Sequence, residues 1–385
     1  MDYDLDQFVE RRGSDSAKWG YYDEDVIPLW VADMDFVSPE PVIRALRERV
    51  DHGVFGYGME PPEIRKVVTE RLLRLYGWQV SPEALLFLPG VVRGFNLASH
   101  AIVPPGGGVL VQTPVYPPIL RAPVSNGFTC DEMELTRQPD GRYVIDFDAF
   151  EAAITDRTSL FILCNPHNPV GRVFQQEELE RMAEICLRHD IMICSDEIHC
   201  DLLFSGSRHL PIASLSPEIA ERTVTLMAPS KTFNIAGLKF SVAIVQNAEL
   251  REKLNAAKGG LMPGIGLMGY TAALAAYRYG QPWLEEVLRY MEANRDFVLQ
   301  YVADHLPGIT AGEIEGTYLA WLDCRQAGIP GNPHEFFLQK ARVALNDGAT
   351  FGRGGEGFVR LNLGASRSTL VKALDQMRDA LATLK

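Results

Sequence analysis

The sequence contains no uninterrupted apolar stretch as long as a membrane span, and its N-terminus lacks the basic start and apolar centre of a signal peptide. Positive charge is also in short supply, because 37 lysines and arginines stand against 50 acidic residues, for a net charge of −13. This balance disfavours nucleic acids and anionic membranes as partners. We therefore expect a cytoplasmic protein that binds neither, and an anionic ligand would require positive groups concentrated at its site.

Cysteine is scarce as well, with six residues that form no C-x-x-C pair and lie partly within apolar runs. This pattern predicts reduced thiols in a core. Cysteines and histidines gather between residues 194 and 209, but their spacing does not fit a metal centre, so no metal is expected. The glycine-rich stretches 106–108 and 352–357 lack the lysine of a P-loop and the spacing of a dinucleotide fingerprint, and they are predicted to be loops.

What the chain does contain is a regular alternation of short apolar runs and helical patterns. The runs expected to form strands lie at residues 85–88, 109–112, 130–134, 159–163, 191–194, 224–227 and 240–245. Helical patterns, clearest over 175–189, separate them, which predicts an α/β fold with a mostly parallel, doubly wound seven-stranded sheet. Ligands bind such sheets at the carboxyl ends of the strands.

A length of 385 residues suggests two domains, and the pattern changes near residue 280. A long helix is expected over 282–305, followed by strands at 317–323 and 358–363 and a closing helix over 368–384. These elements predict a large domain over residues 46–279 and a smaller α+β domain over 280–385. Residues 1–45 show no clear strand and are expected to pack with the smaller domain.

Lys231 is the most informative residue, because it directly follows a predicted buried strand. Burial favours the neutral form of its amine, and a neutral amine can condense with an aldehyde. Asp196 ends another predicted strand, although an aspartate there is often only a helix cap. A lysine and an acid at the ends of adjacent strands suit pyridoxal 5'-phosphate (PLP). The lysine would bond to the aldehyde, and the acid would keep the pyridine nitrogen protonated so that the ring can take up electrons.

Two more polar side chains follow these strands. Asn168 lies in the segment 165–171, where two Asn-Pro steps force extended or turned backbone. Alone it would be a turn residue, but near Asp196 and Lys231 its amide is expected to hydrogen-bond the phenolic oxygen of the cofactor. His199 is expected beside the same oxygen edge, and an ordinary core histidine is its alternative interpretation.

A phosphate cradle is expected in the segment 89–94, where a glycine turn precedes a helix predicted over about 95–103. Free N–H groups and the helix dipole would face the anion there. The expected phosphate contacts are the backbone of Gly90, Val91 and Val92, the hydroxyls of Ser230 and Thr232, and the amine of Lys239. A solvated surface lysine is the alternative for Lys239.

An aromatic and a basic residue complete the predicted site. Tyr116 follows the second predicted strand, and its ring could stack on the pyridine face unless it only packs in the core. Arg360 alternates with apolar neighbours in the predicted strand 358–363, so it could point into the cleft. Its planar fork suits bidentate capture of a carboxylate, and a structural salt bridge is the alternative.

As a set, these residues resemble the fold-type I PLP-dependent enzymes, the aspartate aminotransferase superfamily. Within it, the chain is similar to the cystathionine β-lyase group typified by the MalY and PatB C–S lyases. The segments that carry this closer resemblance are 28–36 (PLWVADMDF), 53–57 (GVFGY), 195–199 (SDEIH), 230–238 (SKTFNIAGL), 317–323 (TYLAWLD) and 358–362 (FVRLN). They span nearly the whole chain.

The resemblance implies a homodimer with each active site at the subunit interface, where Tyr57 would reach the phosphate of the partner's cofactor. It also implies that Trp30, Val31 and Ala32 lie beside the substrate carboxylate. Some positions depart from the wider superfamily. Hydroxyl residues often stand at the positions of Val91 and Val92, a serine at that of Ala228, and an arginine at that of Lys239. Backbone N–H groups must therefore contribute more to phosphate binding.

The expected reaction begins when an amino-acid substrate displaces Lys231 from the aldehyde and the freed amine removes the α-proton as a general base. Asp196 would keep the ring nitrogen charged, and Arg360 would hold the carboxylate and orient the Cα–H bond. Expulsion of a β-thiolate then leads to pyruvate and ammonia. Reprotonation of the cofactor carbon leads instead to a keto acid.

From the family likeness, we expect a PLP-dependent C–S β-lyase that cleaves cystathionine or a related cysteine S-conjugate to a thiol, pyruvate and ammonia. A class I/II aminotransferase is the alternative, since it uses the same residues. A regulatory PLP-binding protein is a third hypothesis. It is disfavoured because the sequence shows no additional domain of a DNA-binding type and because the set of catalytic residues is complete. The loops that meet the leaving group, such as 258–264, contain nothing that selects one thiol.

Overall fold

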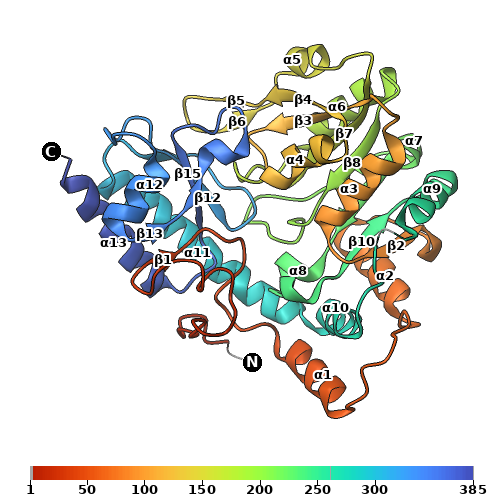
Figure 1. Ribbon diagram of the computed structural model, residues 1–385, viewed down its shortest axis with the longest axis horizontal. Coiled ribbons are helices and arrows are strands. Elements are labelled where there is room, and N and C mark those ends of the chain that lie inside the picture. The colour runs from red at the N-terminus through yellow and green to blue at the C-terminus, as the bar shows by residue number, and fades with distance from the viewer. Residues whose placement is uncertain (1–2, 261, 385) are drawn as a thin grey trace.

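The computed structural model describes residues 3–260 and 262–384. Its largest sheet consists of β2 (Leu85–Leu88), β3 (Gly108–Thr113), β4 (Thr129–Glu134), β7 (Thr158–Cys164), β8 (Met192–Asp196), β9 (Thr223–Met227) and β10 (Ser241–Ile244). The spatial order is β2-β10-β9-β8-β7-β3-β4 (Figure 1). β10 pairs antiparallel with β2 and β9, and the other adjacent strands pair in parallel. The expected mostly parallel sheet is thereby confirmed, with strand ends displaced by at most two residues.

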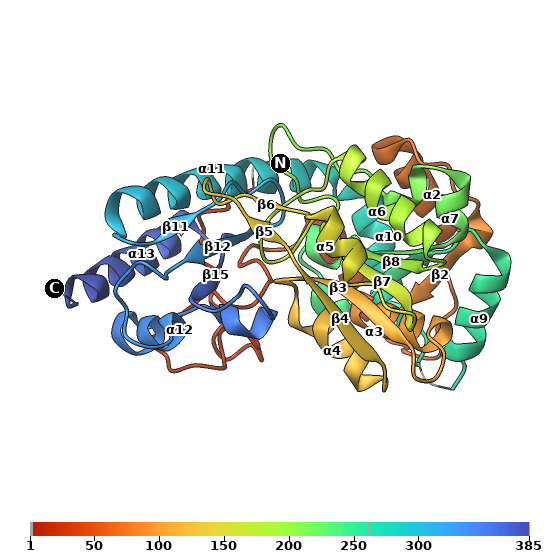
Figure 2. The ribbon, with the colours of Figure 1, turned by 90° about the horizontal axis from the view of Figure 1, so that it is seen from above.

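Helices cover both faces of this sheet (Figure 2). Successive strand residues point to opposite faces, so Ile193 of β8 belongs to the buried cluster that includes α6 (Gln176–Arg188). Cys194 belongs to the cluster on the other face, which includes α3 (Val91–Ile102) and α9 (Ala248–Lys258). Burial on both faces explains why the strands read as continuous apolar runs. The sheet is thus a rigid middle layer whose strand ends can carry functional side chains.

A smaller antiparallel sheet lies on the other side of the molecule. It contains β11 (Thr310–Ala311), β12 (Leu319–Asp323), β15 (Phe358–Asn362) and β14 (Asn346–Asp347), in that order. The helices α11 (Gln281–His305) and α13 (Arg367–Ala382) run beside it (Figure 2). A strand was expected from residue 317, but β12 begins two residues later because Thr317 has φ 71°, which extended backbone does not allow.

The remaining helices and strands lie outside these two sheets. The helices are α1 (Glu40–Asp51), α2 (Ile64–Tyr76), α4 (Pro117–Ser125), α5 (Phe147–Ala152), α7 (Pro217–Glu221), α8 (Pro229–Thr232), α10 (Leu267–Tyr279) and α12 (Pro333–Phe336). The strands are β1 (Ile27–Pro28), β5 (Thr136–Arg137), β6 (Tyr143–Val144) and β13 (Val343–Ala344). Within the first 45 residues, β1 pairs with β13, whereas α1 packs against α10.

Two sequence expectations need correction here. The helix expected over about 95–103 is α3, which begins at Val91 immediately after Gly90. Gly90 has φ 126°, a conformation open mainly to glycine, so the chain turns in one residue and needs no longer loop. The N-terminal region, in which no strand was expected, contributes the two residues of β1. Its parallel partner lies more than 300 residues away, which no local pattern records.

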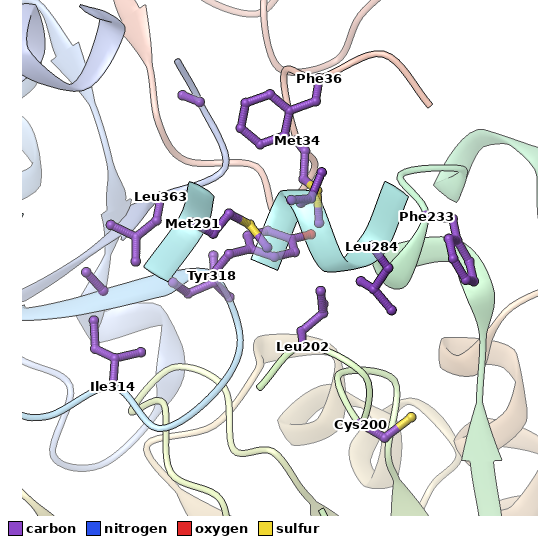
Figure 3. Close-up of a cluster of buried hydrophobic side chains, with 14 of the residues drawn as sticks. Met34, Phe36, Cys200, Leu202, Phe233, Leu284, Met291, Ile314, Tyr318 and Leu363 are labelled. Carbon is purple, nitrogen blue, oxygen red and sulfur yellow. The ribbon is translucent and has the colours of Figure 1, made fainter. Parts of the chain in front are cut away.

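One buried cluster joins the two sheets around α11 (Figure 3). Met34 and Phe36 approach α11 from the N-terminal segment, Leu202 from the large sheet's side, and Tyr318 and Leu363 from the smaller sheet. Burying such side chains stabilises the fold by about 1.5–3 kcal/mol each. The cluster therefore fixes the N-terminal segment between the two sheets, next to the strand ends.

Other sequence expectations concern cysteines, metals and membranes. All six cysteines are free thiols, and all except Cys130 are buried. Across residues 3–260 and 262–384, no three histidine, cysteine or acidic side chains are grouped so that they could hold a metal ion. Among the helices described, none has the length and apolarity needed to cross a membrane.

Candidate active site

A cavity of about 330 Å³ opens where the ends of β7, β8 and β9 meet the beginning of α3. Its lining includes Ala32, Gly90, Val91, Val92, Tyr116, Asn168, Asp196, His199, Ser230, Lys231 and Lys239. All of these were singled out in the sequence. The fold brings them together because β7, β8 and β9 are parallel neighbours, so their carboxyl ends lie at one edge of the sheet.

Lys231 stands on the short helix α8, which follows β9. Pro229 occupies the first position of α8, where its missing N–H group is tolerated. The Lys231 Nζ donates a hydrogen bond to the carbonyl oxygen of Ala32 at 2.5 Å. Burial lowers the pKa of Lys231 to about 8, and the positive charge of Arg360 acts in the same direction. A useful fraction of the amine is therefore uncharged at neutral pH.

Asp196 is the last residue of β8 and is 4% exposed. One oxygen of its carboxylate accepts a hydrogen bond from the Ile198 N–H at 3.2 Å. Burial raises its pKa to about 7, although this N–H group and the charge of Lys231 act in the opposite direction. A positive ring nitrogen placed against Asp196 would favour the ionised carboxylate, so the site favours a cationic partner.

His199 is buried, and its Nδ1 atom has no hydrogen-bond partner among the described residues. Burial, together with the charges of Lys231 and Arg360, holds the pKa of His199 far below its usual value, so the ring is neutral. Buried polar atoms are nearly always paired. The unpaired Nδ1 atom of His199 is therefore available to a ligand atom in the cavity.

Arg360 is almost fully buried and contacts only neutral acceptors. Its guanidinium donates to Asn168 Oδ1 at 2.9 Å, to the Trp30 carbonyl at 3.0 Å and to Asn346 Oδ1 at 2.5 Å. In the region that the structure describes, no carboxylate forms a salt bridge with Arg360, and its Nε is unpaired. Burial lowers the pKa of Arg360 to about 10. This geometry does not support the structural salt bridge and leaves a positive charge for an anion.

Asn168 and Tyr116 occupy the wall between these groups. Because Asn168 Oδ1 accepts from Arg360, its amide nitrogen is the atom left to donate into the cavity. The backbone N–H of Tyr116 donates to the Asn168 carbonyl at 3.0 Å, which ties the two residues together. Burial raises the pKa of Tyr116, so its hydroxyl stays protonated at neutral pH.

The first residues of α3 line one end of the cavity, where an anion could bind. The N–H groups of Val91 and Val92 lie in the first helical turn, where helices leave donors unpaired and the dipole is positive. Lys239 lines the same cavity and is exposed. Ser230 lines it as well. These groups could hold a phosphate without a dedicated row of hydroxyl residues.

Two of the expected phosphate donors are committed elsewhere. The Gly90 N–H donates to the Ser241 hydroxyl at 3.1 Å, so it is not free. The Thr232 hydroxyl donates to Asp201 at 3.0 Å, and Thr232 does not line the cavity. Thr232 faces away because it follows Lys231 on a helical turn, which points successive side chains in different directions.

The residues placed by family resemblance are distributed differently. Tyr57 is fully exposed and lies outside the cavity lining. Trp30 and Val31 also lie outside the lining, but their carbonyls accept hydrogen bonds from Arg360 and Asn362. Ala32 does line the cavity, through the same segment. The N-terminal segment therefore contacts the site mainly with its backbone.

Some functional contacts had no local pattern in the sequence. The Tyr318 hydroxyl donates to the Ala32 carbonyl at 2.8 Å, so Tyr318 and Lys231 share one acceptor. Asn362 donates to the carbonyls of Val31 and Asp33, each at 2.6 Å. Tyr318 and Asn362 lie in segments that carry the family resemblance, which was their only sequence signal. Ile198 also lines the cavity and lies in the resemblance segment 195–199, but no role was predicted for it.

The arrangement fits PLP in each of its parts. Lys231 could hold the aldehyde, and Asp196 could pair with the ring nitrogen. The unpaired nitrogen of His199 and the amide of Asn168 suit the phenolic oxygen. The beginning of α3, with Lys239, suits the phosphate. No group in this set conflicts with the cofactor.

Comparison with known proteins agrees with this geometry. Residues 24–377 match the family of class I and II aminotransferases. Over 98% of its length, the chain is 41% identical to the whole of cystathionine beta-lyase PatB of Bacillus subtilis (strain 168). The crystal structure of cystalysin from Treponema denticola, which contains a PLP cofactor, is 33% identical and covers both chains fully, with a TM-score of 0.96. The PLP-bound C–S lyase of Staphylococcus hominis is 33% identical over 99% of each chain, with a TM-score of 0.94. The chain belongs to the family of class I and II aminotransferases.

Proposed function

We propose that the protein is a PLP-dependent C–S β-lyase that cleaves cystathionine or a related cysteine S-conjugate to a thiol, pyruvate and ammonia. One observation carries the chemistry: the Lys231 amine with its lowered pKa and the buried Asp196 line one cavity. Arg360 lies outside that lining but donates to Asn168 in its wall, and it forms no salt bridge with a carboxylate among the described residues. The choice of a lyase rests on the 41% identity to a relative named cystathionine beta-lyase.

When bound, PLP supplies a covalent anchor for the substrate amine and a sink for the electrons of the broken bond. When it is not bonded to the cofactor, Lys231 would be held by the hydrogen bond that its Nζ donates to the Ala32 carbonyl. Its uncharged amine takes the proton from the substrate Cα as a general base. Asp196 would pair with the ring nitrogen and favour its protonated form, which is the form that accepts electrons.

Arg360 and Asn168 position the substrate for this proton transfer. Arg360 would attract the substrate carboxylate with its positive charge and its remaining N–H donors, and its bond to Asn168 links it to the cavity wall. Fixing the carboxylate and the amine leaves the Cα–H bond one orientation, toward Lys231. After the proton has left, the electrons of that bond expel the thiolate from Cβ. Hydrolysis of the remaining fragment gives pyruvate and ammonia.

An aminotransferase is the second candidate function, and the family match itself favours it. The same residues would remove the α-proton in that reaction. The two functions differ only in the step after proton removal, which is either loss of a group from Cβ or return of a proton to the cofactor carbon. The requirement for a keto acid as second substrate therefore separates them.

We also propose a homodimer in which Tyr57 reaches the partner's cofactor phosphate. The segment 53–59 supports this, because Val54 and Phe55 are each 61% exposed and Met59 is 87% exposed. Such apolar exposure fits a surface that a second copy covers. A cytoplasmic location is part of the proposal and accords with six free cysteines. We also propose a division into a large domain over residues 46–279 and a small domain over residues 280–385, with residues 1–45 packing against the small domain.

The deciding experiment incubates the purified holoenzyme with cystathionine and no keto acid. We expect pyruvate and free thiol to appear in equal amounts, measured by coupled lactate dehydrogenase and by a thiol reagent. Lys231→Ala is the matched negative variant and should release neither product while keeping its circular dichroism spectrum. Turnover that depends on an added keto acid would contradict the lyase and favour the aminotransferase.

A further inference from the structure

Five consecutive backbone carbonyls, from Trp30 to Met34, accept hydrogen bonds from side chains elsewhere in the chain. Their donors are Arg360 for residue 30, Asn362 for residue 31, Lys231 and Tyr318 for residue 32, Asn362 and Lys18 for residue 33, and Arg11 and Asn234 for residue 34. Two of these donors, Lys231 and Arg360, belong to the proposed reaction. The position of this segment therefore bears directly on the site.

A group of four charged residues anchors the segment, and we name Arg11, Lys18, Asp33 and Asp35 the N-terminal charge cluster. Lys18 is 0% exposed, and its Nζ lies 2.7 Å from Asp35 and 3.7 Å from Asp33. Arg11 donates to both oxygens of Asp33, at 3.0 and 2.8 Å, and to Asp35 at 2.7 Å. The indole N–H of Trp19 also donates to Asp35, at 2.8 Å. Two positive and two negative charges thus balance.

Fold stability alone does not explain this cluster. Burying charges costs free energy, and apolar side chains of similar volume often stabilise a protein as well or better. The proposed reaction gives the four residues no chemical step. They lie, however, at the segment that contacts the catalytic lysine, since Asp33 directly follows Ala32. A role in setting the surroundings of Lys231 accounts for both the burial and the location.

Charge is the second connection between the cluster and Lys231. The charged groups that act on the Lys231 amine are Arg360, Asp33, Asp196 and Lys239. Asp33 and Asp196 favour the protonated amine, whereas Arg360 and Lys239 disfavour it. Asp33 is held by Arg11 and Lys18, so these two cations decide how much of its negative charge Lys231 experiences.

We propose that Lys18 and Arg11 are positioning residues for Lys231, which hold the segment 30–34 in place and shield the Lys231 amine from the negative charge of Asp33. The inference rests on Lys231 being the catalytic lysine of the proposed function. It adds that two residues of the N-terminal segment, outside the cavity lining, set the charge state of that lysine. Removing a cation of the cluster should favour the protonated amine, and removing Asp33 should favour the neutral amine.

The test measures the charge state of Lys231 in the protein freed of its cofactor, without any substrate. Brief acetylation at a series of pH values labels only uncharged amines, and mass spectrometry of the peptide that contains Lys231 gives its pKa. We expect Lys18→Met to raise the Lys231 pKa by about 0.5–1 unit and Asp33→Asn to lower it by about as much. The double variant Lys18→Met with Asp33→Asn should return to within a few tenths of a unit of the unaltered protein.

Controls separate this effect from loss of structure. Lys66→Met removes a lysine from the exposed pair of Lys66 with Glu70, whose atoms lie 3.7 Å apart, and should leave the Lys231 pKa unchanged. Lys18→Arg keeps the charge and should shift the pKa less than Lys18→Met. If Lys18→Met does not fold, Arg11→Met takes its place with the same expected direction. Thermal melting identifies variants that are merely destabilised.

Shifts of opposite sign in the two single variants, cancelling in the double variant, would support the proposal. Shifts in the same direction, or no shift in either, would overturn it, because a purely structural role predicts no dependence on the sign of the removed charge. This readout needs neither cofactor nor turnover. A failure of the lyase assay would therefore leave the proposed role of Lys18 and Arg11 intact. A failure of the acetylation experiment would leave the proposed reaction intact.

Discussion

The carbonyl oxygen of Ala32 accepts hydrogen bonds from both the Lys231 amine, at 2.5 Å, and the Tyr318 hydroxyl, at 2.8 Å. Three distant parts of the chain meet at this one atom. A carbonyl oxygen has two lone pairs, so both bonds can form at once. When Lys231 is free of the cofactor, this bond to Ala32 limits where its own lone pair can point. We therefore expect Tyr318 to influence the position of Lys231 through Ala32.

Tyr318→Phe tests that relationship. The change removes one hydroxyl and leaves the ring, so packing against His199, at 5.9 Å between ring centroids, is retained. We expect kcat to fall about 3- to 10-fold with little change in KM, which corresponds to losing one hydrogen bond of about 0.5–1.5 kcal/mol. Steady-state kinetics with cystathionine measure both constants. Tyr301→Phe removes a hydroxyl that donates to Asp375, at 2.5 Å and far from the cavity, and should leave kcat unchanged. An equal loss in both variants would contradict a role for Tyr318.

The sequence predicted most of the sheet and most of the cavity lining for one reason. Strands buried on both faces read as apolar runs, and ligands bind at their carboxyl ends, so Asp196 and Lys231 could be placed by local pattern. The contact between Tyr318 and Ala32 could not, because the two residues are 286 positions apart. The same holds for Gly90, whose N–H is taken by Ser241 on a neighbouring strand. Such contacts depend on how elements pack, and no spacing records them.

Asp196→Asn should stabilise the protein freed of its cofactor, with an effect that depends on pH. The folded state raises the pKa of Asp196 to about 7, chiefly by burial, above its ordinary value. Protonated Asp196 is thus favoured by folding, and the stability linked to it is lost as the pH rises through about 7. An asparagine has no proton to lose. The variant should therefore gain up to about 4 kcal/mol over the unaltered protein at pH 8, and little near pH 4.

Urea unfolding at pH 4.5, 6 and 8 measures this difference. We expect the gap between the two proteins to widen with pH and to level off above about 7. The same variant should bind PLP more weakly and lose nearly all activity, because an amide cannot hold a positive ring nitrogen. Asp146→Asn offers a comparison, since Asp146 caps α5 by accepting from Asp148 and Ala149 N–H groups. A gap that does not vary with pH would show that burial does not set the Asp196 pKa.

Arg360→Lys should impair substrate binding although it keeps the positive charge. A lysine offers a point charge, whereas the Arg360 guanidinium donates to Asn168 and to the Trp30 carbonyl and is proposed to bind an incoming carboxylate as well. We expect kcat/KM for cystathionine to fall about 100-fold or more, mostly through KM, as for the loss of a bidentate ion pair of about 3 kcal/mol. PLP affinity, measured by fluorescence quenching, should change less than threefold. A variant that loses cofactor and substrate binding together would argue that Arg360 shapes the cavity as a whole.

The rate at which PLP becomes attached to the apoprotein should depend on the charge state of Lys231. Burial lowers the pKa of Lys231 to about 8, so the uncharged amine that attacks the aldehyde increases with pH up to that value. Below about pH 7 the rate should rise nearly tenfold per unit, and above about pH 9 it should be constant. Stopped-flow absorbance of the near-visible band monitors the reaction, and borohydride then fixes PLP to the peptide that contains Lys231.

Lys231→Ala should show no such fixation. Lys258→Ala changes another partly buried lysine with a lowered pKa and should behave as the unaltered protein does. A rate that rises steadily to pH 10 would mean that the Lys231 amine is more exposed to water than the structure shows.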